Sequence, residues 1–98
     1  MKLTAELAGG LHLLFANQKK LDLDLIPNAD GRVLLRAVIA ELRDKHVKDH
    51  PELFVSGDSV RPGILVLLNE VDWELEGSLD AELKDGDVVC FISTLHGG

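Results

Sequence analysis

Two glycines close the sequence, in the run CFISTLHGG that ends at Gly97 and Gly98. A glycine has no Cβ and reaches all backbone dihedral angles, so it lets a backbone approach another group closely. Since glycine makes up about 7% of average sequence, two glycines at a chosen pair of positions arise by chance in about 1 case in 200. The pair is a candidate site of chemistry, although a truncated chain or a frayed terminus would also account for it.

Side chains elsewhere in the sequence are weaker candidates. Cys90 occurs with four histidines, but its neighbours Val89 and Phe91 place it in the middle of a strand, which favours an inert thiol over a nucleophile. The histidines lack metal-ligand spacing, and the alternating acids from Glu70 to Glu76 lack the EF-hand spacing. No nucleophile, base and orienting group occur together, so the sequence predicts a protein that is not an enzyme and binds no metal or cofactor.

Composition and charge restrict the function further. The chain has 98 residues, 46% of them hydrophobic, and a formal net charge of −7, which suits one small domain. From residue 51 onward its only bases are Arg61 and Lys84, among many acids. Direct nucleic-acid binding is disfavoured because affinity for phosphate backbones comes from clustered Lys and Arg. The acidic half predicts either a partner with a basic docking surface or a surface that only keeps the protein soluble.

The sequence also carries expectations about location. Its start, MKLTAELAGG, lacks an apolar run long enough for a signal peptide or a membrane span. The single cysteine, Cys90, has no partner for an intrachain disulfide, which favours a reducing compartment. We therefore expect a cytoplasmic protein, with the nucleus as a second location, that is a monomer and binds no membrane.

Period-two patterns predict strands at both ends of the chain. Apolar and polar residues alternate over 3–7 and again over 21–25, and Gly9-Gly10 offers a turn after the first run, so we expect an N-terminal hairpin with further strand material after the turn. The run ILVLLN at 64–69 is apolar on both faces and predicts a central strand. VVCFIS, at 88–93, predicts the last strand.

A single amphipathic helix is expected between these strand regions. We predict Asp30 as its N-cap and Pro51 as the residue that ends it. Its apolar positions recur with helical spacing and should face the core. They are Leu34, Leu35, Val38, Ile39 and Leu42.

Shorter elements fill the second half of the sequence. We expect a polar loop over 56–63 and a short strand that carries Trp73 and Leu75. A brief helical turn then precedes the turn KDGD at 84–87. Trp73 is expected to lie partly in the core, since the chain has few other aromatic residues.

The order hairpin, helix and further strands in about ninety residues fits the β-grasp architecture. This is an α+β fold in which a mixed sheet wraps on one main helix and the last strand lies in the middle of the sheet. We expect residues 1–94 to form this domain and residues 95–98 to form a flexible tail.

Longer motifs point to one family. The chain resembles the ubiquitin-related modifier family, the sulfur-carrier and protein-modifier branch of ubiquitin-like proteins, in the runs HPELFVSGDSVRPGILVLLNEVDWEL, LKDGDVVCFIS and TLHGG. The pattern at Gly86, Asp87 and Val88, followed by an apolar strand and Gly-Gly, is shared with bacterial-type sulfur carriers for thiamine and molybdopterin. The stretch from Asp58 to Leu75 separates this branch from those carriers.

This resemblance implies a chemistry at the chain end. The carboxylate of Gly98 would be adenylated by an E1-like adenylyltransferase that uses ATP and Mg²⁺, and a rhodanese-type sulfurtransferase portion of that enzyme would convert the adenylate into a thiocarboxylate. The sulfur would pass through a cytosolic tRNA thiolation complex to the wobble uridine of tRNAs. The same end can be joined to lysines of target proteins. Gly97, His96 and Leu95 would thread into the activating enzyme.

Comparison with similar folds also suggests a contact surface on the sheet. In the last strand Val89 and Phe91 should face the helix, which leaves Cys90 and Ile92 on the other face. The predicted partner-binding patch is Ile92 and Cys90 with Val66 from the strand at 64–69, where Ile64, Leu68 and the neighbours of these residues are the alternatives.

Two other functions remain open at this point. One is a ubiquitin-like binding module that never reacts, against which the Gly-Gly end argues. The other is a sulfur carrier for a cofactor such as molybdopterin, against which the run DSVRPGILVLLNEVDWEL argues.

Overall fold

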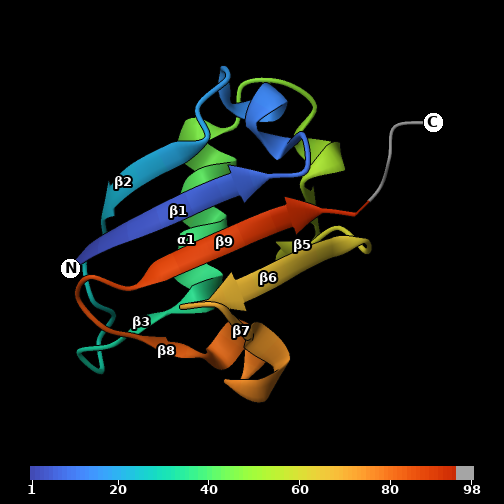
Figure 1. Ribbon diagram of the computed structural model, residues 1–98. Coiled ribbons are helices and arrows are strands. Elements are labelled where there is room, and N and C mark those ends of the chain that lie inside the picture. Colours follow the sequence, from blue (N-terminus) through green and yellow to red (C-terminus); the bar gives the residue numbers. More distant parts are fainter. Residues whose placement is uncertain (95–98) are drawn as a thin grey trace.

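A five-stranded mixed sheet crosses the molecule, and helix α1 (Leu35–Glu41) packs against one of its faces (Figure 1). The computed structural model describes residues 1–94. The strand order is β2-β1-β9-β6-β7, with β1 and β9 parallel and the other neighbours antiparallel. The strands are β1 (Lys2–Ala8), β2 (Lys20–Asp24), β6 (Ile64–Leu68), β7 (Val71–Asp72) and β9 (Val88–Ser93). The last strand lies in the middle of the sheet, which confirms the expected β-grasp fold.

The N-terminal hairpin is confirmed, but its connection is helical. β1 pairs with β2 from Lys2↔Asp24 to Glu6↔Lys20. Between them lies the 3₁₀ helix η1 (Leu11–Phe15) in place of the expected strand material. A strand would have turned Leu13 to the same face as Leu11 and Phe15, whereas the helix buries these two and leaves Leu13 61% exposed.

Helix α1 forms where the periodicity predicted it, with Leu35, Val38 and Ile39 buried. The prediction of Asp30 as N-cap is wrong. Asp30 lies in a turn in which the Asn28 side chain accepts the N–H groups of residues 30 and 32. The N-cap is Leu34, whose extended backbone belongs to a strand.

Two small two-stranded sheets accompany the main sheet and helix α1. β3 (Val33–Leu34) pairs with β8 (Glu82–Leu83), which holds the start of the helix to the segment before β9. β4 (Val55–Ser56) pairs with β5 (Ser59–Val60), so the segment expected as a polar loop contains a hairpin.

The remaining helical turns are short. The π-helical turn η2 (Leu42–His46) continues α1 and ends five residues before Pro51, which begins the 3₁₀ helix η3 (Pro51–Leu53). The 3₁₀ helix η5 (Ser78–Asp80) supplies the predicted helical turn. No helix of residues 1–94 is long and apolar enough to cross a membrane.

The strand expected around Trp73 and Leu75 is not formed. Pairing stops at Asp72, whose carboxylate accepts the N–H of Glu74 and caps the 3₁₀ helix η4 (Trp73–Leu75). Trp73 packs partly against the core as expected, while Leu75 is 80% exposed.

Three phenylalanines of the core contact one another, and one of them, Phe91, belongs to β9. The Phe54 ring makes edge-to-face contacts with Phe15 and Phe91, at centroid distances of 5.2 and 5.5 Å. All three side chains are fully buried. The cluster thus connects η1, the residue after η3 and the central strand β9.

Candidate functional site

The chain reaches its last described residue, Thr94, directly from the central strand. The β1 neighbour of Ile92 is Ala8, and the β6 neighbour of Ser93 is Ile64. A strand held on both edges is a firm base for the segment that follows. The predicted reactive residue and the predicted threading residues lie outside the described part of the chain. They are Gly98, Gly97, His96 and Leu95.

Two turns meet the chain where β9 ends. Thr94 donates its N–H to the carbonyl of Gly63 at 2.9 Å, and its hydroxyl donates to the same oxygen. On the β1 side, Gly9 has a φ of +65°, and a Cβ at this position would lie 2.2 Å from the carbonyl oxygen of Ser93. Gly9 therefore serves the close approach of two backbones as well as a turn. The sequence suggested the turn but gave no sign of the contact.

The face of the sheet away from α1 carries an apolar surface. Val89 and Phe91 are fully buried against the helix side, while Cys90 and Ile92 are half-buried on the other face. Their β6 neighbours are Leu67 and Leu65 respectively. We call these four residues, Leu65, Leu67, Cys90 and Ile92, the open-face patch.

The inclusion of Val66 in an exposed patch is wrong. Val66 is fully buried because it lies opposite Phe91 and shares its face. Leu65, its neighbour, is 38% exposed and takes its place. The strand itself was predicted correctly, but the face that it turns toward the core was not. Side chains alternate between the two faces of a strand, so a shift of one residue exchanges the buried side chains with the exposed ones.

Acidic side chains border a hollow at one end of the open-face patch. The hollow is lined by Glu6, Leu67, Asn69, Glu70, Val88 and Cys90. Burial raises the pKa of the Cys90 thiol above its ordinary value, and the nearby Glu6 carboxylate raises it further. Both causes favour the neutral thiol at pH 7, in agreement with the predicted inert cysteine.

Asn69 holds the start of β9 at this end of the surface, a role that the sequence did not predict. Its side-chain oxygen accepts the N–H of Val88 at 2.9 Å, and its amide group donates to Asp87 at 3.0 Å. Asn69 and Glu70 both have positive φ, of 48° and 70°, as the tight turn between β6 and β7 requires. An asparagine between two apolar runs was the available signal.

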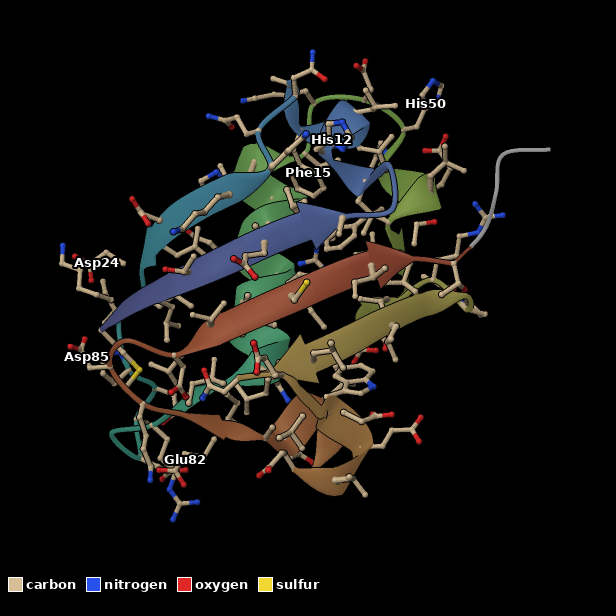
Figure 2. The ribbon with its side chains drawn as sticks, viewed as in Figure 1. His12, Phe15, Asp24, His50, Glu82 and Asp85 are labelled. Atoms are coloured by element: carbon tan, nitrogen blue, oxygen red, sulfur yellow. The ribbon has the colours of Figure 1, made fainter. Side chains whose placement is uncertain are left out.

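Other polar side chains are spread over the molecule. Figure 2 shows Glu82 and Asp85 at the end where β1 begins, and His12 and His50 near the other end. His50 contacts Glu52 at 3.1 Å. Within residues 1–94 no three His, Cys, Asp or Glu side chains are grouped so that they could hold a metal ion.

Comparison with known proteins yields consistent relatives. A model of the Urm1 (ubiquitin related modifier) family matches residues 2–98. The ubiquitin-related modifier 1 homolog of Chlamydomonas reinhardtii is 54% identical over all of this chain and 99% of its own length. Ubiquitin-related modifier 1 of Homo sapiens is 48% identical over all of this chain and 96% of its own.

Solved structures give the same picture. The solution structure of Urm1 from Trypanosoma brucei has a TM-score of 0.81 at 45% identity, covering 99% of this chain and 95% of that one. SAMP1 from Haloferax volcanii has a TM-score of 0.74 at 18% identity, and all of each chain is covered. At that identity the second likeness shows the fold alone.

Proposed function

The chain belongs to the ubiquitin-related modifier (Urm1) family of ubiquitin-like modifiers and sulfur carriers, and we propose that its reactive group is the carboxylate of Gly98. An E1-like enzyme joins this carboxylate to the AMP part of ATP, in the presence of Mg²⁺, and pyrophosphate leaves. A persulfide on the rhodanese-type portion of that enzyme attacks the carbonyl carbon and displaces AMP. A second thiol then cleaves the S–S bond of the acyl disulfide, which leaves a thiocarboxylate and an enzyme disulfide.

The sulfur acceptor and the second use of the activated end are part of the same proposal. The thiocarboxylate gives its sulfur to the wobble uridine of cytosolic tRNAs through a separate thiolation complex, so this chain needs no direct contact with nucleic acid. The activated end is also joined to lysine side chains of target proteins. The net charge of −7 supports an indirect role, since phosphate backbones repel an acidic surface.

The observation that carries the proposal is the family match through residue 98, which lies five residues after the end of the central strand β9 in the sequence. A carboxylate is a poor electrophile, and its conversion into an acyl-phosphate anhydride supplies a leaving group. Glycines at 97 and 98 have no side chain to obstruct a narrow channel in another protein. A firmly held strand before them limits the positions that the carboxylate must search.

Intact mass spectrometry tests the proposal. The chain is incubated with an E1-like activating enzyme, ATP, Mg²⁺ and a persulfide source. We expect a mass gain equal to the exchange of one oxygen for one sulfur, dependent on ATP. An unchanged mass, with an enzyme that is active on another carrier, would favour the non-reacting binding module.

We further propose that the open-face patch docks onto the activating enzyme, which gives a prediction for Ile92. The change Ile92→Asp should raise KM for activation about tenfold or more, since buried contacts at the centre of an interface often contribute that much. Because Ile92 is only half-buried and lies on the face away from the core, the melting temperature should change little. The matched control is Ile26→Asp, at a side chain that is 92% exposed. Equal KM values for the two variants would contradict docking through the patch.

The uneven charge gives a prediction about association with the same enzyme. Residues 51–98 contain ten acids and two bases, and we expect this surface to steer the protein toward a basic face. The association rate constant, measured by stopped flow, should fall about tenfold or more between roughly 20 mM and 500 mM salt because added ions screen the attraction. A rate that does not depend on salt would mean that the acids serve solubility alone.

A further inference from the structure

We propose that Gly9 and Thr94 are positioning residues, which together with Gly63 clamp the chain at the point where residues 95–98 begin. This inference rests on the proposed reaction of Gly98, because a clamp matters for function only if the chain end must reach a fixed place. The three residues come from three separate parts of the sheet layer, namely the turn after β1, the turn before β6, and the end of β9.

The β1 side of the clamp is a backbone contact with no room for a side chain. A Cβ on Gly9 would lie 2.2 Å from the carbonyl oxygen, 2.9 Å from the nitrogen and 3.1 Å from the carbonyl carbon of Ser93. All three atoms belong to the main chain, so they cannot move aside by a simple rotamer change. Gly10 also has a positive φ, of +92°, but a Cβ there would meet nothing within 4 Å. The sequence thus offers a control one residue away.

The β6 side of the clamp is a pair of hydrogen bonds. Both the N–H and the hydroxyl of Thr94 donate to the carbonyl of Gly63. The last registered pair between β6 and β9 is Ile64↔Ser93. Thr94 therefore extends the attachment of β9 by one residue beyond the ladder, while Gly9 closes the opposite side.

A fixed pivot sets how far the carboxylate can reach. Four residues, 95–98, span at most about 14 Å when fully extended, at about 3.5 Å each. An activating site deeper than this from Thr94 is out of reach, and a shift of about 1 Å in a reacting group can cost about a hundredfold in rate. If the clamp opened by one residue, the reach would grow by about 3.5 Å and Thr94 would no longer be the fixed starting point of the segment.

Hydrogen exchange measures the clamp without any enzyme. The amide of Thr94 should exchange markedly more slowly than an unstructured amide, because it is bonded to Gly63. In Gly9→Ala this protection should fall about fivefold or more, the worth of one hydrogen bond. In Gly10→Ala it should stay as in the unmodified chain, although both variants place alanine at a positive φ. Equal protection of Thr94 in the two variants would overturn the clamp.

Changing the length of the segment after Thr94 distinguishes a positioning role of Gly9 from a role in stability alone. Deletion of His96 shortens the segment by one residue, and kcat for adenylation should fall about a hundredfold or more with KM changed less than about twofold. Adding Gly9→Ala to this deletion should raise kcat again, because the opened clamp returns one residue of reach. If Gly9 served stability only, the double variant would be worse than either single variant, and that result would overturn the proposal.

Two further outcomes are distinguishable. If Gly9→Ala does not fold, Thr94→Pro replaces it, since proline removes both donors to Gly63 and leaves the contact of Gly9 in place. This variant should likewise raise kcat in the chain that lacks His96. If the unmodified chain is not adenylated at all, the proposed function fails, and the exchange of the Thr94 amide still decides whether the clamp exists.

Discussion

Deletion of Gly98 is expected to abolish formation of the thiocarboxylate and to leave the free energy of unfolding unchanged. The shortened chain ends in a glycine carboxylate of the same chemistry, but that group lies about 3.5 Å nearer to the pivot at Thr94. A reacting group that is displaced by about 1 Å can already lose about a hundredfold in rate. We therefore expect a loss of more than about a hundredfold in the rate of adenylation. Stability should not change because the buried core lies wholly within residues 3–91.

Two measurements on the same sample check this expectation. Intact mass after incubation with the E1-like enzyme, ATP and a persulfide source reports the chemistry, and urea unfolding reports the stability. Gly98→Ala is a useful companion, since it keeps the length and adds one methyl group at the reacting end. We expect this variant to retain more activity than the deletion. Sulfur incorporation into the shortened chain at the normal rate would show that the carboxylate of residue 98 is not the specific reactant.

The chemistry proposed for the chain end rests on covalent structure and on the family motifs, and it stays a prediction. Gly97 and Gly98 define a backbone without side chains whatever the fold is, and the family motifs surround them. The parts of the site that needed the structure are contacts between distant segments. Gly9 touches Ser93, and Asn69 bonds to Val88, only because β9 lies between β1 and β6. Neither neighbour relation has a local signature in the sequence.

The same distinction explains which parts of the fold were predicted. Strong periodicity located the main strands and the helix, and the burial of Val38 and Ile39 follows it. Asp30 failed as an N-cap because residues 33–34 pair with β8, a tertiary contact that outweighs a local capping preference. Val66 failed as a surface residue because the register with Phe91 decides the covered face. Long-range pairing, which a single sequence does not show, overrode local signals at both positions.

A substitution in the core near the end of β9 should have as large an effect as a change in the tail, but on stability rather than on activity. Phe54→Ala is expected to lower the free energy of unfolding by about 3–5 kcal/mol, the usual cost of removing a buried phenylalanine. Phe54 is fully buried and its ring contacts both Phe15 and Phe91, so the cavity would lie between η1 and β9. Small domains have about 5–15 kcal/mol in total, so this change should remove a large share of the stability.

Leu53→Ala separates this effect from the loss of an apolar side chain as such. Leu53 is the neighbouring residue but is 40% exposed, so its truncation should cost no more than about 1 kcal/mol. Urea denaturation with equal slopes for both variants would allow the two free energies to be compared directly. If Phe54→Ala cost as little as Leu53→Ala, the three rings would not act as one packed unit. The fixed base that the proposed clamp requires under β9 would then have to come from the strand pairing alone.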